Sequence, residues 1–283
     1  MPQQEAPIRL QEYGVGIFQM ALTKSAFKKV LKKKYVTVND ARGTTATFIY
    51  GGEQIILSIP KEKESDKRLI FPLKVLFEDD HLAVIHKPAG ILVSGNSFKT
   101  IANALDQNLV PSQLFDATKP QPVHRLDYAT TGILLVGKTK SSIRSLCQLF
   151  EDRAIQKSYF AVSIGEMPSE GEMNTEVDDK TARSTYIVKD SVPSERFGTL
   201  NLVQLTPYTG RRHQLRQHLA HRGNPILGDQ QYGEEPLILN GKGLYLHAHS
   251  LAFVHPFTQE KLYVIDKLPE RFTKIFPSKS EQK

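Results

Sequence analysis

The sequence predicts an α+β protein, and three of its features lead to that prediction. Short aliphatic segments bounded by turn residues are typical of strands, and apolar residues three or four positions apart are typical of helices. Both patterns occur, but they do not alternate strictly, which disfavours a doubly wound parallel sheet. A length of 283 residues, 40% of them hydrophobic, suffices for about two folded domains with a real core.

The first 60 residues predict a small helical and β unit. Phe27, Val30 and Leu31 recur at helical spacing, and the lysines between them fall on the opposite face. After this helix we expect a strand over 35–38, a turn at Asn39-Asp40, and strands over 47–50 and 54–59. The Gly51-Gly52 pair would join the last two strands as a hairpin.

A domain boundary is predicted at residues 61–67 (KEKESDK), because this segment has no apolar residue and a dense mixture of charges. The predicted domains are therefore 1–67, which includes this linker, and 68–283. In the second domain we expect strands over 73–77, 82–85, 133–136, 159–164, 200–205 and 262–265. Helices are expected over 141–150 and 211–221, the latter with Thr209 as its N-cap and Gly223 and Pro225 at its end.

The chain is basic, with 37 lysines and arginines against 30 acidic residues and a net charge of +7. A surface of this kind attracts polyanions, of which nucleic acid is the commonest. Residues 1–60 hold more than half of the excess. The N-terminal lysine cluster consists of Lys28, Lys29, Lys32, Lys33 and Lys34.

The composition also limits the compartment in which the protein works. No apolar run approaches the roughly 18 residues needed to cross a bilayer, and the N-terminus lacks a basic region followed by an apolar core. The single cysteine, Cys147, excludes an internal disulfide and a multi-thiolate metal site. We therefore expect a cytoplasmic protein.

Two segments carry candidate functional side chains. In HRLDYATTG (124–132), Arg125 and Asp127 would share one face of an extended chain, although an exposed ion pair is the alternative interpretation. The segment 209–228 is expected to bind a phosphate at the start of a helix, unless its basic face is only a solvated surface. It contains no acid and these basic residues: Arg211, Arg212, His213, Arg216, His218, His221 and Arg222.

Two further features have competing interpretations. Tyr159 is either a core aromatic residue or a cleft residue that uses its ring and hydroxyl together. His218 and His221, with Asp229 further on, could imitate metal ligands. Their three-residue spacing comes without a third ligand at a recognised offset, so no metal site is predicted.

A phosphate-loop pattern leaves a nucleotide hydrolase as an alternative function. GILLVGKT at 132–139 matches that pattern, and LYVID at 262–266 resembles the strand whose Asp binds Mg²⁺ in such enzymes. Residues 133–136 are themselves strand-like, whereas a phosphate loop follows a strand and bends around the phosphates. The match is therefore physically poor.

Several of these segments together resemble the RluA family of RNA pseudouridine synthases. The resemblance rests on HRLD at 124–127 with TTG at 130–132, KSY at 157–159, TGR and HQLR within 209–216, and NPILGD at 224–229. VLFEDDHLAVIHKPAGILV at 75–93 also resembles the opening strands of that family, so the resemblance covers roughly residues 70 to 265. One departure is Arg212, which replaces a usual threonine.

Residues 8–60 resemble the αL-type RNA-binding motif, first known from a ribosomal protein and often attached to these synthases. Lys34 and Asp40 stand where that motif usually has glycine. The two resemblances together imply a mixed, mostly antiparallel sheet domain with a central cleft flanked by helices, beside a small N-terminal RNA-binding domain.

The family resemblance implies an isomerisation of uridine within RNA. The bond from ribose to the ring nitrogen breaks, the uracil turns in place, and ring carbon 5 bonds to the ribose. This reaction needs neither a redox change nor an energy input, so we expect no cofactor and no metal.

The resemblance also implies the roles of the site residues. Asp127 would attack the ribose or the ring or remove a sugar proton, Arg216 would be its basic partner, and Tyr159 would stack on the uracil and accept the proton from carbon 5. Arg125 would fill the gap left by the flipped uridine. The other substrate contacts would come from His124, Arg211, Arg212 and His213, and the N-terminal lysines would bind backbone phosphates.

The implied partner is RNA, with large-subunit ribosomal RNA favoured and transfer RNA open, and the protein would act as a monomer away from membranes. A non-catalytic RNA-binding or ribosome-assembly factor is the alternative. The presence of Asp127, Tyr159 and Arg216 argues against that alternative.

Overall fold

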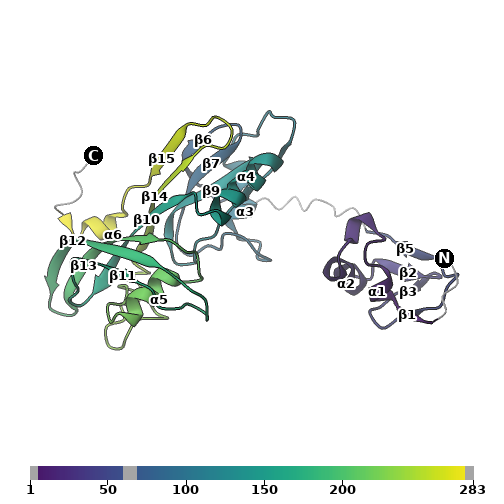
Figure 1. Ribbon diagram of the computed structural model, residues 1–283, viewed down its shortest axis with the longest axis horizontal. Helices are drawn as coiled ribbons and strands as arrows, with labels where there is room; N and C mark the ends of the chain where they lie inside the picture. Colours follow the sequence, from purple (N-terminus) through teal and green to yellow (C-terminus); the bar gives the residue numbers. More distant parts are fainter. Residues whose placement is uncertain (1–5, 60–68, 278–283) are drawn as a thin grey trace. The chain divides into compact units, whose positions relative to one another are not determined.

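A computed structural model describes residues 6–59 and 69–277, which fall into two compact units (Figure 1). The N-terminal unit lies within Met1–Lys67 and the C-terminal unit within Arg68–Lys283. The linker expected at 61–67 lies outside the described residues. Over the ranges that are described, no helix is both long enough and apolar enough to cross a membrane.

The N-terminal unit combines short helices with two small sheets. Its strands pair in the order β3-β2-β5 and, separately, β1-β4. Thr23 caps the start of α2, because its hydroxyl accepts the Ala26 N–H at 3.1 Å. The elements are β1 (Ile8–Arg9), α1 (Leu10–Tyr13), a 3₁₀ turn (Gln19–Ala21), α2 (Lys24–Lys32), β2 (Val36–Val38), β3 (Ala41–Arg42), β4 (Phe48–Ile49) and β5 (Ile55–Leu57).

The predicted apolar face of α2 is confirmed. Phe27, Val30 and Leu31 are buried and form the core of this unit with residues from the neighbouring strands and α1. The turn expected at Asn39-Asp40 is also present, and both residues have positive φ values, 47° and 62°. Of the lysine cluster, Lys28 is half-buried and the other four members are exposed.

The hairpin expected around Gly51-Gly52 is wrong. β4 pairs with β1, and β5 pairs with β2, so the two strands belong to different sheets. The Glu53 carboxylate accepts the N–H groups of Tyr50 and Gly51, both at 2.7 Å, and closes a local turn between them. Beyond that turn the Gln54 N–H donates to the Asn39 side chain, which directs β5 toward β2.

The C-terminal unit is built on one large sheet, and its α+β class agrees with the prediction. The strand order is β11-β12-β13-β10-β14-β9-β7-β6, with β15 paired to β14 and β8 paired to β9. Among the described pairs, β14 with β9 is parallel and the rest are antiparallel. The strands are β6 (Lys74–Glu78), β7 (Leu82–Lys87), β8 (Ala117–Pro122), β9 (Thr131–Thr139), β10 (Gln156–Ile164), β11 (Glu170–Met173), β12 (Ser184–Ser194), β13 (Gly198–Pro207), β14 (Leu246–Val254) and β15 (Lys261–Ile265).

Few helices accompany this sheet within residues 69–277. They are α3 (Ile101–Ala104), a 3₁₀ turn (Leu105–Gln107), α4 (Lys140–Glu151), α5 (Gln214–His221) and α6 (Glu270–Thr273). The helix expected over 141–150 is confirmed as α4, which packs on β9 and begins with a capping box between Thr139 and Ser142. The helix expected over 211–221 begins later than predicted, at Gln214, and Thr209 is not its N-cap. The Thr209 hydroxyl donates to the Gln214 side chain at 2.7 Å instead.

All six predicted strands of this unit are present, but β8, β11, β12 and β14 were not expected. Their sequences carry polar residues or histidines, which weaken the aliphatic pattern. β14 matters most for the site, because it lies between β10 and β9 and so brings Tyr159 of β10 near the segment that precedes β9.

The phosphate-loop interpretation is wrong. All nine residues of β9, which include GILLVGKT, are buried in the sheet. Lys138, which would bind a nucleotide phosphate, is 2% exposed and donates to Glu78 at 2.8 Å. Both faces of β9 are covered by apolar clusters, which explains why its sequence is a nearly continuous apolar run.

Candidate active site

A cleft of about 1370 Å³ opens on the C-terminal unit. Its walls come from the segment before β9, the end of α4, the start of β10 and the segment that leads into α5. All eight residues expected at the site in this unit line it: His124, Arg125, Asp127, Tyr159, Arg211, Arg212, His213 and Arg216. The sheet thus gathers residues that are up to 92 positions apart (216 − 124) in the sequence.

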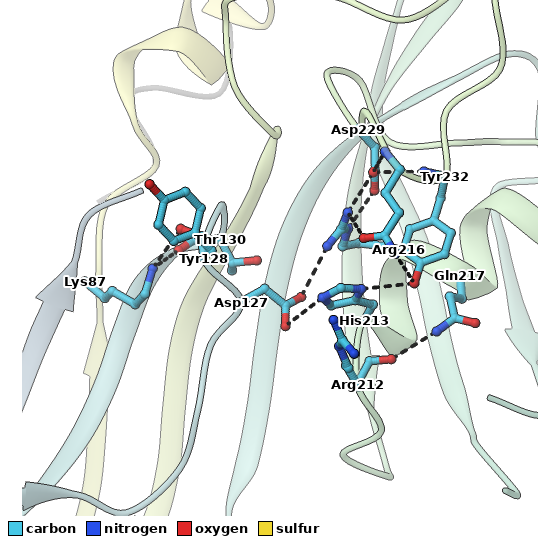
Figure 2. A network of polar contacts seen from close by, with 11 residues as sticks. Lys87, Asp127, Tyr128, Thr130, Arg212, His213, Arg216, Gln217, Asp229 and Tyr232 are labelled. Atoms are coloured by element: carbon cyan, nitrogen blue, oxygen red, sulfur yellow. Dashed lines mark hydrogen bonds and ion pairs between the residues drawn. The ribbon is translucent and has the colours of Figure 1, made fainter. Parts of the chain in front are cut away.

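The loop that carries Asp127 is fixed by a buried lysine (Figure 2). The Lys87 ammonium is fully buried and donates to the carbonyls of Pro88, Tyr128 and Thr130 at 3.0, 3.3 and 2.9 Å. Burial lowers its pKa to about 8, although the nearby charge of Asp127 opposes that shift. Sequence reasoning did not select Lys87, whose only signal was its place in the HKPAG segment.

Arg216 lies between two carboxylates. Its Nε and Nη2 donate to Asp229 at 2.7 and 2.8 Å, and its Nη1 lies 3.8 Å from Asp127 Oδ2. The short bidentate pair is therefore with Asp229, and the contact with Asp127 is longer. Burial raises the pKa of Asp229, but the bonds from Arg216 outweigh burial and hold that pKa below its ordinary value.

His213 supplies the second contact to Asp127. It has a left-handed backbone, with φ of 55°, just before α5, and its Nε2 lies 3.6 Å from Asp127 Oδ1. The other ring nitrogen, Nδ1, is 3.0 Å from the Tyr232 hydroxyl. Because the carboxylate is an acceptor, it favours the tautomer with the proton on Nε2, in which Nδ1 accepts from Tyr232. Burial lowers the pKa of His213, while Asp127 opposes that shift.

Tyr232 and Asp229 complete this polar network, and Figure 2 shows both beside Arg216. The Arg216 guanidinium lies 4.9 Å from the centre of the Tyr232 ring, which stabilises it by a cation–π contact. Asp229 also accepts the N–H groups of Gln231 and Tyr232, at 3.0 and 3.1 Å. The sequence analysis considered Asp229 as a possible metal mimic and as the end of the NPILGD segment, and it did not suggest Tyr232.

Tyr159 lies on β10 between β13 and β14 and packs against two apolar clusters. It therefore combines the two interpretations left open by the sequence, since it is a half-buried core aromatic and also lines the cleft. Burial and the charge of Asp127 both raise the pKa of its phenol. The hydroxyl is therefore protonated at neutral pH.

His124 and Arg125 differ in what their side chains do. His124 Nε2 accepts the Leu135 N–H at 2.9 Å, and the ring stacks on Phe150 at 4.6 Å. Burial and the nearby Lys157 lower its pKa to about 3, so the ring is neutral. His124 thus already has a structural partner at Nε2, whereas Arg125 is exposed at the cleft.

Basic side chains surround the cleft. Arg211 and Arg212 are exposed, and Arg211 Nε donates to the Thr181 carbonyl at 3.1 Å. Arg153, Lys157 and Arg183 also line the cleft. The sequence analysis used Lys157 only as part of the KSY segment and did not select the other two. The five lysines of the N-terminal cluster belong to the other unit.

Two of the three residues considered as metal mimics, His218 and Asp229, have other partners. His218 Nε2 is bonded to the Thr175 carbonyl at 3.0 Å, and Asp229 is paired with Arg216. Within residues 6–59 and 69–277, no group of three or more His, Cys, Asp or Glu side chains is arranged to hold a metal ion.

Comparisons with known proteins agree on one family. A family model described as RNA pseudouridylate synthase matches residues 81–221. Ribosomal large subunit pseudouridine synthase D of Nitrosomonas europaea is 32% identical over 269 residues, which cover 88% of this chain and 78% of that protein. Ribosomal large subunit pseudouridine synthase C of Pasteurella multocida is 32% identical over 310 residues, which cover 99% of this chain and 92% of that protein.

A solved structure, "Human RNA Pseudouridylate Synthase Domain Containing 4", is similar in fold. Its TM-score is 0.58 at 28% sequence identity, and the match covers 71% of this chain and 90% of that chain.

Proposed function

Because the chain belongs to the RluA family of RNA pseudouridine synthases, which isomerise uridine in RNA to pseudouridine, we propose that the cleft around Asp127 is its active site. One observation carries this proposal. The half-buried Asp127 carboxylate faces Arg216 at 3.8 Å and His213 at 3.6 Å in a large basic cleft.

We propose that Asp127 is the catalytic group that attacks the ribose or the uracil ring of the target uridine or removes a proton from the sugar. The bond between ribose C1′ and ring N1 breaks, a bond from C1′ to C5 forms, C5 loses a proton and N1 gains one, so the atoms balance. Arg216 and the Nε2–H of His213 place a positive charge and a donor beside the carboxylate, and these contacts orient it in the cleft for a nucleophilic or basic role. Lys87 keeps the loop in position by its hydrogen bonds to the Tyr128 and Thr130 carbonyls.

Tyr159 is the proposed stacking residue for the target uracil. Its ring is packed from behind by two apolar clusters, so it offers a rigid face to a flat base. Because its phenol is protonated, the hydroxyl can accept a proton from C5 only if it passes its own proton to another base. Asp127 is the carboxylate whose charge acts on this phenol.

The target uridine would leave its stack to reach Asp127, at a cost of a few kcal/mol. Arg125 is exposed on the same short segment as Asp127 and is the residue we propose to fill the gap. Arg211, Arg212 and His213 would contact the flanking backbone and the flipped nucleotide. His124, whose Nε2 accepts the Leu135 N–H, would also contact the substrate from the wall of the cleft.

The substrate we propose is large-subunit ribosomal RNA, because the relatives from Nitrosomonas and Pasteurella carry that substrate in their names. The N-terminal unit would bind RNA as an αL-type domain, through the exposed lysines of α2 and the residues after it. We propose that the protein acts as a monomer and in the cytoplasm, where the lone Cys147 stays reduced.

The test is a map of pseudouridine across total RNA from a strain that lacks the protein. That strain is complemented with the wild type, with Asp127→Asn, or with Asp106→Asn as a control for an exposed aspartate. We expect one or a few large-subunit sites to disappear and to return with the wild type and Asp106→Asn only.

Two outcomes would contradict the proposal. Sites restored by Asp127→Asn would exclude Asp127 as the catalytic group and favour the RNA-binding assembly factor. If the missing sites lie only in transfer RNA, the proposed ribosomal substrate is wrong, but the proposed pseudouridine synthase activity still stands.

A further inference from the structure

A second cavity adjoins the segment that carries Asp127. It encloses about 420 Å³ and shares no lining residue with the large cleft. Thr130 lines the cleft and the next residue, Thr131, lines this cavity, so the chain between Asp127 and β9 separates the two. The function proposed above makes no use of this cavity.

The cavity is lined by more positive than negative charge. Lys74, Lys267 and Arg271 line it, and Asp266 is its one carboxylate. Asp266 is 2% exposed and already has partners, since His86 Nδ1–H donates to it and the Lys74 ammonium lies 3.6 Å away. Its charge is therefore compensated within the wall, and Lys267 and Arg271 remain as excess cations.

Arg271 is the unusual member of this set. Its Nη1 and Nη2 donate to the carbonyls of Lys242 and Leu244 at 3.2 and 2.8 Å, and its Nε is buried without a partner. Across the described ranges no carboxylate pairs with this guanidinium. The guanidinium lies 4.9 Å from the centre of the Tyr245 ring. Burial lowers the pKa of Arg271, and the nearby Tyr245 opposes that shift only in part. A bound anion would supply the missing charge.

We propose that this cavity binds a phosphate group, held by Arg271, Lys267 and Lys74. Arginine and lysine together are the side chains that recognise phosphate, and the volume admits a phosphate with a sugar or base attached. Two sources share this chemistry: a backbone phosphate of the substrate RNA, or a free phosphorylated small molecule. The phosphate site is independent of the function proposed above, and only its assignment to RNA depends on it.

A bound phosphate would touch the two segments that fix the catalytic loop. Pro88 and Ala89 line the cavity directly after Lys87, whose ammonium binds the carbonyls of Tyr128 and Thr130. Thr131 also lines the cavity, and its hydroxyl forms a hydrogen bond with His247 Nδ1 at 2.9 Å. A phosphate bound in the cavity would therefore stabilise the position of Asp127.

The first experiment titrates the full-length protein with pyrophosphate and follows the imidazole NMR signals of His86, which lines the cavity. These signals are assigned with His86→Gln. We expect a saturable shift in the wild type and a midpoint at least tenfold higher in Lys267→Ala. Lys267 is exposed, so its removal should not affect folding. The control, Lys189→Ala, removes an exposed lysine of β12 outside the cavity and should leave the midpoint within twofold.

The second experiment identifies the source of the phosphate. If the source is the RNA backbone, substrate RNA should displace pyrophosphate from the cavity and reverse the shift of the His86 signals. The fall of log affinity with log salt should also become shallower by about one in Lys267→Ala. If RNA leaves the pyrophosphate-shifted His86 signals unchanged, the site takes a free phosphorylated molecule. The proposal is overturned if pyrophosphate causes no saturable shift at His86, or if Lys267→Ala binds it as tightly as the wild type.

Discussion

Arg216 makes its two short hydrogen bonds to Asp229, at 2.7 and 2.8 Å, while its remaining amino group lies 3.8 Å from Asp127. One carboxylate therefore fixes the plane of the guanidinium, and the other receives its charge without a short hydrogen bond. Asp127 Oδ2 consequently stays open to a reacting atom while a cation lies beside it.

The first prediction follows from this division. Asp229→Asn should lower kcat more than tenfold and reduce the free energy of unfolding by about 3 kcal/mol, because a buried guanidinium loses its charged partner. Single-turnover pseudouridylation and urea denaturation would measure the two effects. Asp106→Asn, which breaks an exposed pair with Lys119, should change stability by less than about 1 kcal/mol. Wild-type activity in Asp229→Asn would show that Arg216 needs no anchor.

The second prediction concerns Lys87 and pH. Its pKa is lowered from 10.5 to about 8, so between these values the unfolded chain binds a proton that the folded chain lacks. The free energy of unfolding of the wild type should therefore rise with pH over this window, by up to about 3 kcal/mol relative to Lys87→Met. Denaturation of both proteins at several pH values measures this difference. If the free energies of unfolding of the two proteins change with pH in parallel, the prediction is wrong. As a control, Lys189→Met at an exposed site should differ from the wild type by the same amount at every pH.

A third prediction separates the two roles of Tyr159. Tyr159→Phe keeps the ring that packs against both apolar clusters, so KM for RNA should stay within about twofold. If the hydroxyl carries the C5 proton, kcat should fall at least tenfold. Steady-state kinetics on a short substrate RNA, with release of tritium from C5 as the readout, measures both parameters. An unchanged kcat would restrict Tyr159 to stacking.

The fourth prediction tests the N-terminal unit as an RNA binder. Lys29 and Lys32 are exposed on α2. If both are changed to alanine, the fall of log affinity with log salt should become shallower by about two. Filter binding at four salt concentrations gives the slope. The matched control replaces Lys189 and Lys261, which are exposed on β12 and β15, and should leave the slope close to that of the wild type. Equal slopes in all three proteins would remove the lysines from the interface.

The sequence determined those features that depend on neighbouring residues. The apolar spacing of Phe27, Val30 and Leu31 defined the buried face of α2, and six aliphatic segments of the C-terminal unit each became a strand. Asp127 and Arg216 were selected as candidate site residues because they stand in recognisable local motifs, and both line the cleft. Local patterns work in such cases because side chains a few positions apart share one face of a helix or strand.

Tertiary structure decided the remaining features. The order of the strands made Lys87 the residue that holds the Tyr128 and Thr130 carbonyls and placed Asp229 against Arg216. The same strand order buried GILLVGKT, and the pairing of β5 with β2 replaced the expected hairpin. Hydrogen bonds and burial between distant segments depend on which strands become neighbours. The spacing of residues along one strand does not specify which other strands will pair with it.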